Sequence, residues 1–120
     1  MKKLIFVVIA SIIVSTACGS SAPSTSSAPG PLPTVPADYA GQINPLGTEA
    51  TPAGANVFKT YCVSCHGEEG KGDGPASQAL DPRPANLVEV NKIAADDFLY
   101  WRINTGVLGT SMPAWKGVVT

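Results

Sequence analysis

Apolar residues follow three different patterns along the 120 residues of the chain. Residues 4–14 form one apolar run, LIFVVIASIIV. Residues 19–37 carry no charge and consist of Ser, Pro, Thr, Ala and Gly with a few scattered apolar side chains. In the third pattern, residues recur at helical spacing and would share one face of a helix: Gly54, Val57, Phe58 and Tyr61. The first pattern is typical of an apolar N-terminal segment, the second of an irregular one and the third of a packed helix.

Start and stop signals frame two helices. The pair Thr51-Pro52, as N-cap and first helical position, predicts a helix that carries the third pattern. A second helix is predicted over residues 97–105, with Asp96 as its cap and Gly106 after its end.

The residues between the two helices are predicted to be mostly irregular. Residues 67–74 contain four glycines, which favour close turns over a helix. They do not form a phosphate-binding loop, because no strand precedes them and no Lys-Ser or Lys-Thr pair ends them. One helical turn is predicted over residues 76–80, and the prolines of residues 81–87 predict an extended segment.

The amino terminus has the features of an export signal, residues 1–17. Two lysines precede the apolar run of residues 4–14, which is too short to span a bilayer. Small residues before Cys18 resemble the bacterial lipoprotein processing box, although Ser15 stands where that box prefers Leu. Lipid attachment at Cys18 is favoured, because Cys18 is otherwise an unpaired thiol in an exported protein. Ordinary cleavage near Ala17 is the alternative.

Residues 18–50 are predicted to be a disordered tether, rich in Ser, Pro and Ala, between this anchor and a domain over residues 51–120. The uncharged stretch cannot bury enough apolar surface to offset the entropy of ordering it. Whether the end of the tether packs on the domain stays open, because this end carries the apolar side chains Tyr39, Ile43 and Leu46. Charged residues make up 14% of the chain and the net charge is -1, so the sequence lacks the excess of Lys and Arg that is typical of nucleic-acid-binding proteins.

The sequence Cys62-Val63-Ser64-Cys65-His66 is the C-x-x-C-H pattern of covalent haem attachment. On a helical turn, Cys62 and Cys65 point the same way, so both thiols can reach the two vinyl groups at one porphyrin edge. His66 shares that face and can ligate the iron. A dithiol redox motif is the first alternative, but no strand-like alternation precedes Cys62. A zinc site is the second, but it needs four ligands and the chain has three Cys and one His.

Met112 is the candidate for the second axial ligand of the iron. It precedes Pro113, which disfavours helical geometry and displays the thioether from a loop. Thioether ligation raises the potential of a haem. A Met that fills a gap in the core is the alternative.

Taken together, these residues resemble the class I cytochrome c family over about residues 51–119. The resemblance rests on Gly54 and Phe58, the C-x-x-C-H pattern, the loop at 70–75, the proline segment up to Leu87 and the stretch GTSMPAW at 109–115. It implies a small all-α fold around one covalent haem c, with His66 as proximal and Met112 as distal ligand. It also implies that Pro84 gives its carbonyl to the other ring nitrogen of His66, a role that Pro82 could take instead.

One departure from the family concerns the end of the chain. Members continue past the Met-Pro segment into a C-terminal helix that crosses the first helix. This chain ends at Thr120, so a fold that lacks the final helix is expected, either as a fragment or as a domain completed by a partner. The prediction is no helix after Trp115 and an apolar face at Val57, Phe58 and Tyr61 that is partly open to solvent.

The resulting functional expectation is electron transfer by a carrier that is not an enzyme. The lipoprotein start resembles that of bacterial membrane-anchored carriers and of small cytochrome subunits of respiratory complexes. Expected partners are an electron donor, an electron acceptor and a membrane reached through the lipid, with the protein on the periplasmic or extracytoplasmic face. Two alternatives stay open: a haem subunit of a larger redox enzyme, and a haem sensor or enzyme with a labile sixth ligand.

Overall fold

The computed structural model describes residues 30–119, and within this range it contains helices and no strand. The helical fold predicted from the family resemblance is therefore confirmed for the described residues. The elements in chain order are the 3-10 turn η1 (Thr48–Ala50), α1 (Thr51–Tyr61), α2 (Val63–His66), the 3-10 turn η2 (Ser77–Ala79), α3 (Leu87–Val90) and α4 (Asp96–Thr105).

Helix α1 begins one residue earlier than predicted. Its N-cap is Ala50 rather than Thr51, because η1 leads directly into it and no side chain caps it. Pro52 stands in the first turn, where its missing N–H costs no hydrogen bond. The helix ends at Tyr61, and the N–H of its C-cap Cys62 donates to the Phe58 carbonyl at 2.8 Å. The predicted helix therefore leads directly into the turn that begins at Cys62.

Helix α4 matches its predicted end more closely than its predicted start. Gly106 follows it with a φ of 70°, a conformation that other residues rarely adopt. Asp96 is not the cap that the sequence predicted, since the N-cap is Ala95 and Asp96 lies in the first turn. The buried side chain of α4 is Phe98, which packs edge-on against Trp101 with ring centroids 5.9 Å apart.

Helix α3 was not predicted, because a proline-rich segment precedes it. Its N-cap is Asn86, whose side chain accepts hydrogen bonds from Val88 N at 3.0 Å and Glu89 N at 3.3 Å. Asn followed three positions later by Glu is a sequence signal for a helix start, so the cap was visible in the sequence. The turn predicted over residues 76–80 is present as η2.

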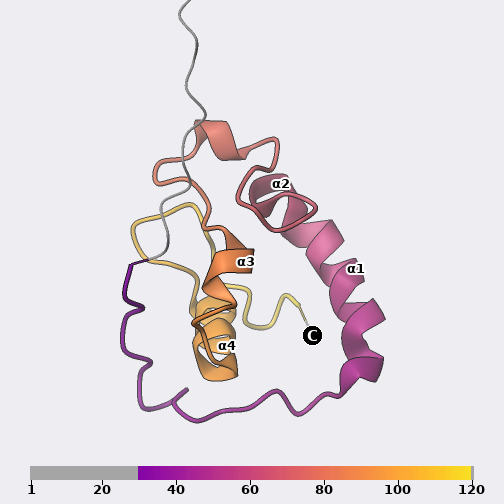
Figure 1. The fold of residues 1–120 in the computed structure, drawn as a ribbon, viewed down its shortest axis with the longest axis vertical. Coiled ribbons are helices and arrows are strands. Elements are labelled where there is room, and N and C mark those ends of the chain that lie inside the picture. The colour runs from indigo at the N-terminus through magenta and orange to yellow at the C-terminus, as the bar shows by residue number, and fades with distance from the viewer. Residues whose placement is uncertain (1–29, 120) are drawn as a thin grey trace, which may run out of the picture.

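In Figure 1, α1 forms one side of the molecule and α4, with α3 beside it, the other. The chain after α4 first loops on the side of the molecule away from α1, and its last part then runs between the two sides. Trp115 in this returning segment contacts Tyr61 at the end of α1, with ring centroids 5.4 Å apart. The last segment thus connects the two sides, and between Trp115 and residue 119 there is no helix, as predicted.

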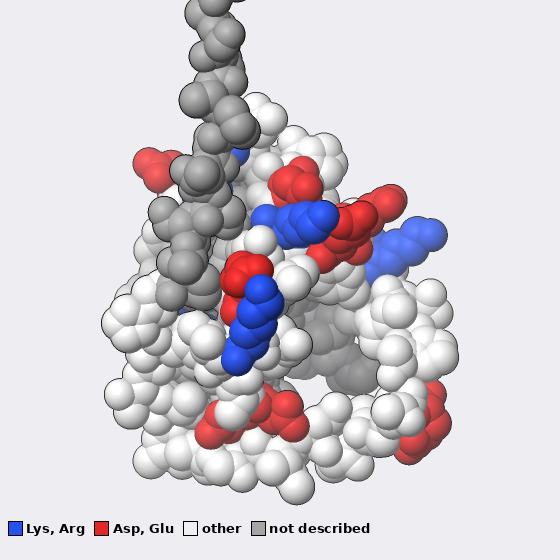
Figure 2. All heavy atoms as spheres, in the orientation of Figure 1, with Lys and Arg blue, Asp and Glu red and all other residues white. Residues whose placement is uncertain are grey.

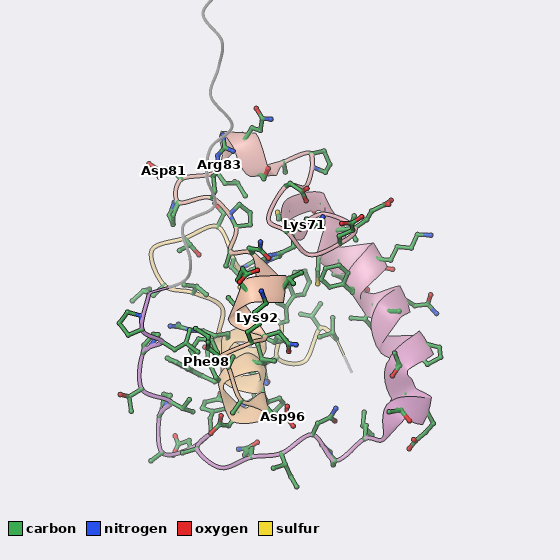
Figure 3. All side chains as sticks on the ribbon, in the orientation of Figure 1. Lys71, Asp81, Arg83, Lys92, Asp96 and Phe98 are labelled. Atoms are coloured by element: carbon green, nitrogen blue, oxygen red, sulfur yellow. The ribbon has the colours of Figure 1, made fainter. Side chains whose placement is uncertain are left out.

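Residues 36–47, which we term the N-terminal strap, run below α4 and on to α1 (Figure 1). The Gly41 amide donates to the Asp97 carboxylate at 2.9 Å, and the Asn44 amide donates to Asp96 at 3.0 Å. Figure 3 shows Asp96 at the end of α4 that faces this segment. Tyr39 adds an aromatic contact to Tyr100, with ring centroids 5.9 Å apart.

The strap lies inside the range 18–50 for which a disordered tether was predicted, yet it has specific contacts to α4. The reason is that backbone amides of the strap supply partners for carboxylates in the first turn of the helix. Residues 18–29 of the predicted tether and residues 1–17 of the predicted export signal lie outside the described residues. No helix within residues 30–119 combines the length and apolar character needed to cross a bilayer.

The protein core is small. Among residues 30–119, the buried hydrophobic side chains are Val90 and Phe98, each 8% exposed. On α1, Val57 and Phe58 are half-buried and Tyr61 is 43% exposed, so the predicted partly open face is observed. Few apolar side chains are therefore covered by protein alone, and the face of α1 borders a cavity instead.

Candidate functional site

Cys62, Cys65 and His66 lie on one helical turn. Cys65 N and His66 N both donate to the Cys62 carbonyl, at 3.1 and 2.9 Å. Both cysteines are free thiols and half-buried. The helical geometry that was predicted for this motif is therefore present.

The glycine-rich loop at residues 67–74 packs against this turn and donates hydrogen bonds to its carbonyls. Gly72 N donates to the His66 carbonyl at 2.8 Å, and Gly74 N donates to the Cys65 carbonyl at 3.2 Å. A Cβ atom on Gly74 would lie 2.5 Å from the carbonyl oxygens of Val63 and Ser64, closer than real contacts allow. Glycine at this position thus lets the loop satisfy carbonyls at the end of the turn, which have no partner within the helix.

A backbone carbonyl orients the His66 ring, but it is the carbonyl of Ala85 and not that of Pro84. His66 Nδ1 lies 3.1 Å from Ala85 O. The Pro84 carbonyl oxygen lies instead against Gly72. The prediction of Pro84 is therefore wrong by one residue and its alternative Pro82 is wrong by three, although the segment is right.

This contact determines the tautomer of His66. A carbonyl only accepts, so Nδ1 carries the proton and donates it to Ala85 O. In the neutral ring Nε2 then has the free lone pair, which is the state that a metal ligand requires. The bond also fixes the plane of the ring.

The turn opens into a cavity of about 330 Å³ whose lining holds no Asp, Glu, Lys or Arg. The apolar face of α1 forms one wall through Gly54, Val57, Phe58 and Tyr61. The volume is in the range of small-molecule and cofactor sites. The apolar side chains that α1 leaves open are therefore the wall of a binding site.

The opposite walls come from segments far away in the sequence. The proline segment contributes Pro82 and Pro84, α4 contributes Ile103, and the last segment contributes Met112 and Trp115. Met112 is half-buried, and it lines the same cavity as His66. The fold therefore brings both candidate iron ligands to one cavity, as expected from the sequence.

Charged side chains lie outside this cavity. Figure 2 shows acidic and basic groups on the outer surface and a hollow between the two sides of the molecule. On the loop after the turn, a hydrogen bond and ion pair with Lys71 lower the pKa of the exposed Glu69 carboxyl. The cavity is thus a low-charge region surrounded by a polar rim.

The environment of Cys62 argues against a reactive dithiol. Burial, and to a lesser extent the neighbouring Cys65, raises the pKa of the Cys62 thiol. Catalytic dithiols need the opposite shift, because the thiolate is the nucleophile. Within residues 30–119, no group of three or more His, Cys, Asp or Glu side chains is placed to hold a metal ion, so the described residues supply no four-ligand zinc site.

An uncharged cavity that joins a C-x-x-C-H turn to a loop methionine, inside a small all-α fold, defines a c-type cytochrome domain. The family model described as "Cytochrome C oxidase, cbb3-type, subunit III" matches residues 49–120, and the chain belongs to this family. Neither the comparison with curated proteins nor that with solved structures gave a significant match. The family's cofactor is a covalently bound c-type haem with its iron, and the uncharged lining with its thiols, imidazole and thioether fits that group.

Ala85 and Trp115 are among the contributors to the site that the sequence did not predict. Ala85 was missed because a carbonyl acceptor has no residue-type signal. No role in the site was predicted for Trp115, although its ring lines the cavity and contacts Tyr61. An aromatic residue directly after a ligand loop was the available hint.

Proposed function

We propose that the protein is a one-electron carrier in which Cys62 and Cys65 hold the haem by thioethers and His66 and Met112 ligate its iron. The bound haem supplies exchange of one electron between ferrous and ferric iron. The observation that carries the proposal is the single cavity lined by the C-x-x-C-H turn and by Met112. If His66 and Met112 both hold the iron, no position would be left open for a substrate, so the proposed role is electron transfer and not catalysis.

Each part of the cavity has a role in this proposal. The Ala85 carbonyl holds the proton on His66 Nδ1, so that Nε2 would be free to ligate the iron, and it fixes the plane of the ring. The Met112 thioether favours the reduced state and raises the potential. The uncharged walls, including Phe58 and Trp115, keep water and charge away from the iron.

The test is expression with a haem-maturation system, followed by denaturing electrophoresis with haem staining and by redox titration. We expect a haem-stained band that survives acid–acetone extraction, and a single reversible one-electron transition. Haem that is lost on extraction would contradict the thioether attachment. A ferrous protein that binds carbon monoxide readily would favour the alternative of a sensor or enzyme with a labile sixth position.

The family match favours a second candidate, in which the domain is the haem subunit of a larger redox complex. In that case the haem relays electrons within an assembly and the protein does not diffuse. Purification from membranes in mild detergent separates the two candidates. Stoichiometric co-purification with other haem or copper subunits supports the complex, and a free monomer supports the mobile carrier.

We further propose that Cys18 is lipidated and that the domain lies on the extracytoplasmic face of a membrane, as domains of this family typically do. Cys18 is outside the described residues, so the support is the sequence pattern alone. Labelled palmitate is expected in the wild-type protein and not in Cys18→Ser. An unlabelled, soluble mature protein that begins near residue 18 would decide for ordinary cleavage.

A further inference from the structure

The loop that carries Met112 is attached to α4 at both ends. At its start, the Gly106 amide donates to the Arg102 carbonyl at 2.9 Å. At its end, the Trp115 amide donates to the Ile103 carbonyl at 2.9 Å. These carbonyls belong to the last turn of α4 and have no partner inside the helix. The anchors therefore fix where the loop begins and ends, but not how its tip is folded.

The tip of this loop has little apolar support. Leu108 is 101% exposed, and a Cβ atom on Gly109 would meet nothing within 4 Å. Burial of apolar surface therefore does not hold the tip in place. Hydrogen bonds inside the loop have to do so instead.

Those internal bonds converge on Thr110 and Met112. The Thr110 hydroxyl donates to the Val107 carbonyl at 2.8 Å and accepts from the Met112 amide at 3.1 Å. The Met112 carbonyl accepts from the Val107 amide at 3.1 Å. Both backbone polar groups of Met112 are thus bonded within the loop, one of them through a side chain.

Close packing at Gly106 leaves this arrangement little room to shift. A Cβ atom on Gly106 would lie 2.6 Å from the Met112 carbonyl oxygen. The backbone of Met112 thus approaches the end of α4 as closely as a glycine permits. A loop that opens has to break the Thr110 bonds, because the remaining contacts of the tip are few.

We infer that Thr110 is a positioning residue for Met112, whose hydroxyl keeps the ligand loop closed and so limits replacement of the thioether by an outside ligand. The inference rests on the proposed ligation by Met112. An outside ligand binds only when the loop is open, and its apparent affinity scales with the open fraction. Removing the hydroxyl raises that fraction without removing the thioether.

The test is a titration of the oxidised holoprotein with imidazole, followed by loss of the weak far-red absorption band that marks thioether ligation of ferric haem. In Thr110→Val the band is present without imidazole, and the affinity for imidazole rises about three- to tenfold, the range that the net loss of one hydrogen bond gives. Thr110→Ser keeps the hydroxyl and has the wild-type affinity.

Thr60→Val is the matched control. Thr60 also donates its hydroxyl to a backbone carbonyl, that of Asn56 at 2.8 Å, but on α1 and outside the cavity lining. We expect its imidazole affinity to equal that of the wild type. An equal rise in Thr60→Val and Thr110→Val would show a general loss of stability and would overturn the inference, as would an unchanged affinity in Thr110→Val.

Hydrogen exchange in the wild-type protein gives a second measurement that does not depend on a variant folding. The Met112 amide is expected to exchange more slowly than the amides of Leu108 and Gly109 at the exposed tip. Equal exchange rates at the three positions would contradict the inference. A wild-type protein without the far-red band would refute Met112 ligation itself, and the inference with it, whereas a band with unchanged variants refutes the inference alone.

Discussion

At the scale of single residues, the site depends on two thiols, one imidazole and one thioether, and no other side chain can take over the bonds that these groups make. The two thiols of the Cys62 turn face the same cavity, and His66 is oriented by one backbone carbonyl. Met112 is the sole methionine in residues 2–120. Substitutions at these positions are therefore expected to change the bound group in distinct, measurable ways.

Cys65→Ala is expected to leave a single thioether. The vinyl group that Cys65 would saturate then stays conjugated with the porphyrin, so the main visible band of the reduced protein moves to longer wavelength. The measurement is the absorption spectrum of the reduced pyridine derivative. Cys18→Ala serves as the control with an unshifted spectrum, and an unshifted spectrum in Cys65→Ala would show that Cys65 is not attached.

Met112→Ala is expected to lower the haem potential and to abolish the far-red band. The physical reason is that a thioether stabilises the ferrous state more than water or a nitrogen ligand does. The expected shift is a tenth or more of the ~0.8 V range over which axial ligands set haem potentials. Redox titration measures it, and an intact band in the variant would mean that another residue is the sixth ligand.

At the scale of elements, the contact between the N-terminal strap and α4 consists of two amide–carboxylate hydrogen bonds and the aromatic contact of Tyr39 with Tyr100. Carboxylates in the first turn of α4 accept from strap amides and also face the positive end of the helix dipole. The strap passes from α4 to the start of α1, so it connects the two sides that enclose the cavity (Figure 1). It is therefore expected to stabilise the domain without contributing to the lining of the cavity.

Asp97→Ala is expected to lower the free energy of unfolding of the holoprotein by about 1.5–2 kcal/mol, the lower part of the range for hydrogen bonds to charged groups. The Gly41 amide, which loses its acceptor, is expected to exchange faster. Denaturant unfolding and hydrogen exchange measure these effects, and the haem potential stays unchanged.

Asp38→Ala is the control, because Asp38 lies in the strap and no side-chain hydrogen bond or ion pair of its carboxylate to residues 30–119 is present. Its effect is expected to stay within about 0.5 kcal/mol, as for ordinary surface substitutions. Equal destabilisation by the two substitutions would show that the strap contact contributes nothing specific.

At the scale of the whole molecule, the protein has a very small core of its own. Two hydrophobic side chains among residues 30–119 are buried, and a domain of about 70 residues is marginal even with a complete core. The half-buried walls of the cavity become a core only when the haem fills it. Folding is therefore expected to depend on haem attachment.

The protein expressed without haem maturation is expected to lose most of its helical circular dichroism and to unfold without a cooperative transition. The holoprotein should show both the helical signal and a sharp transition. The double substitution Cys62→Ala and Cys65→Ala provides the same comparison inside a maturation-competent host. A cooperative apoprotein with native helicity would contradict this dependence on haem.

The sequence by itself determined the features that depend on local spacing. The C-x-x-C-H turn needs only a helical turn, α1 needs only its apolar period and Pro52, and the end of α4 needs only Gly106. These features involve residues a few positions apart, for which backbone geometry leaves few choices. The C-x-x-C-H pattern also indicated the cofactor, and resemblance to a family then supplied the all-α fold.

Only the tertiary structure decided which distant groups meet. His66 contacts the carbonyl of Ala85 rather than Pro84, because the direction of neighbouring carbonyls depends on how the proline segment packs against the glycine loop. Asp96 bonds the strap instead of capping α4, since an amide 52 residues away competes for its carboxylate. Residue type does not encode such choices, because every carbonyl and every amide is an equally capable partner until the fold brings one of them within reach.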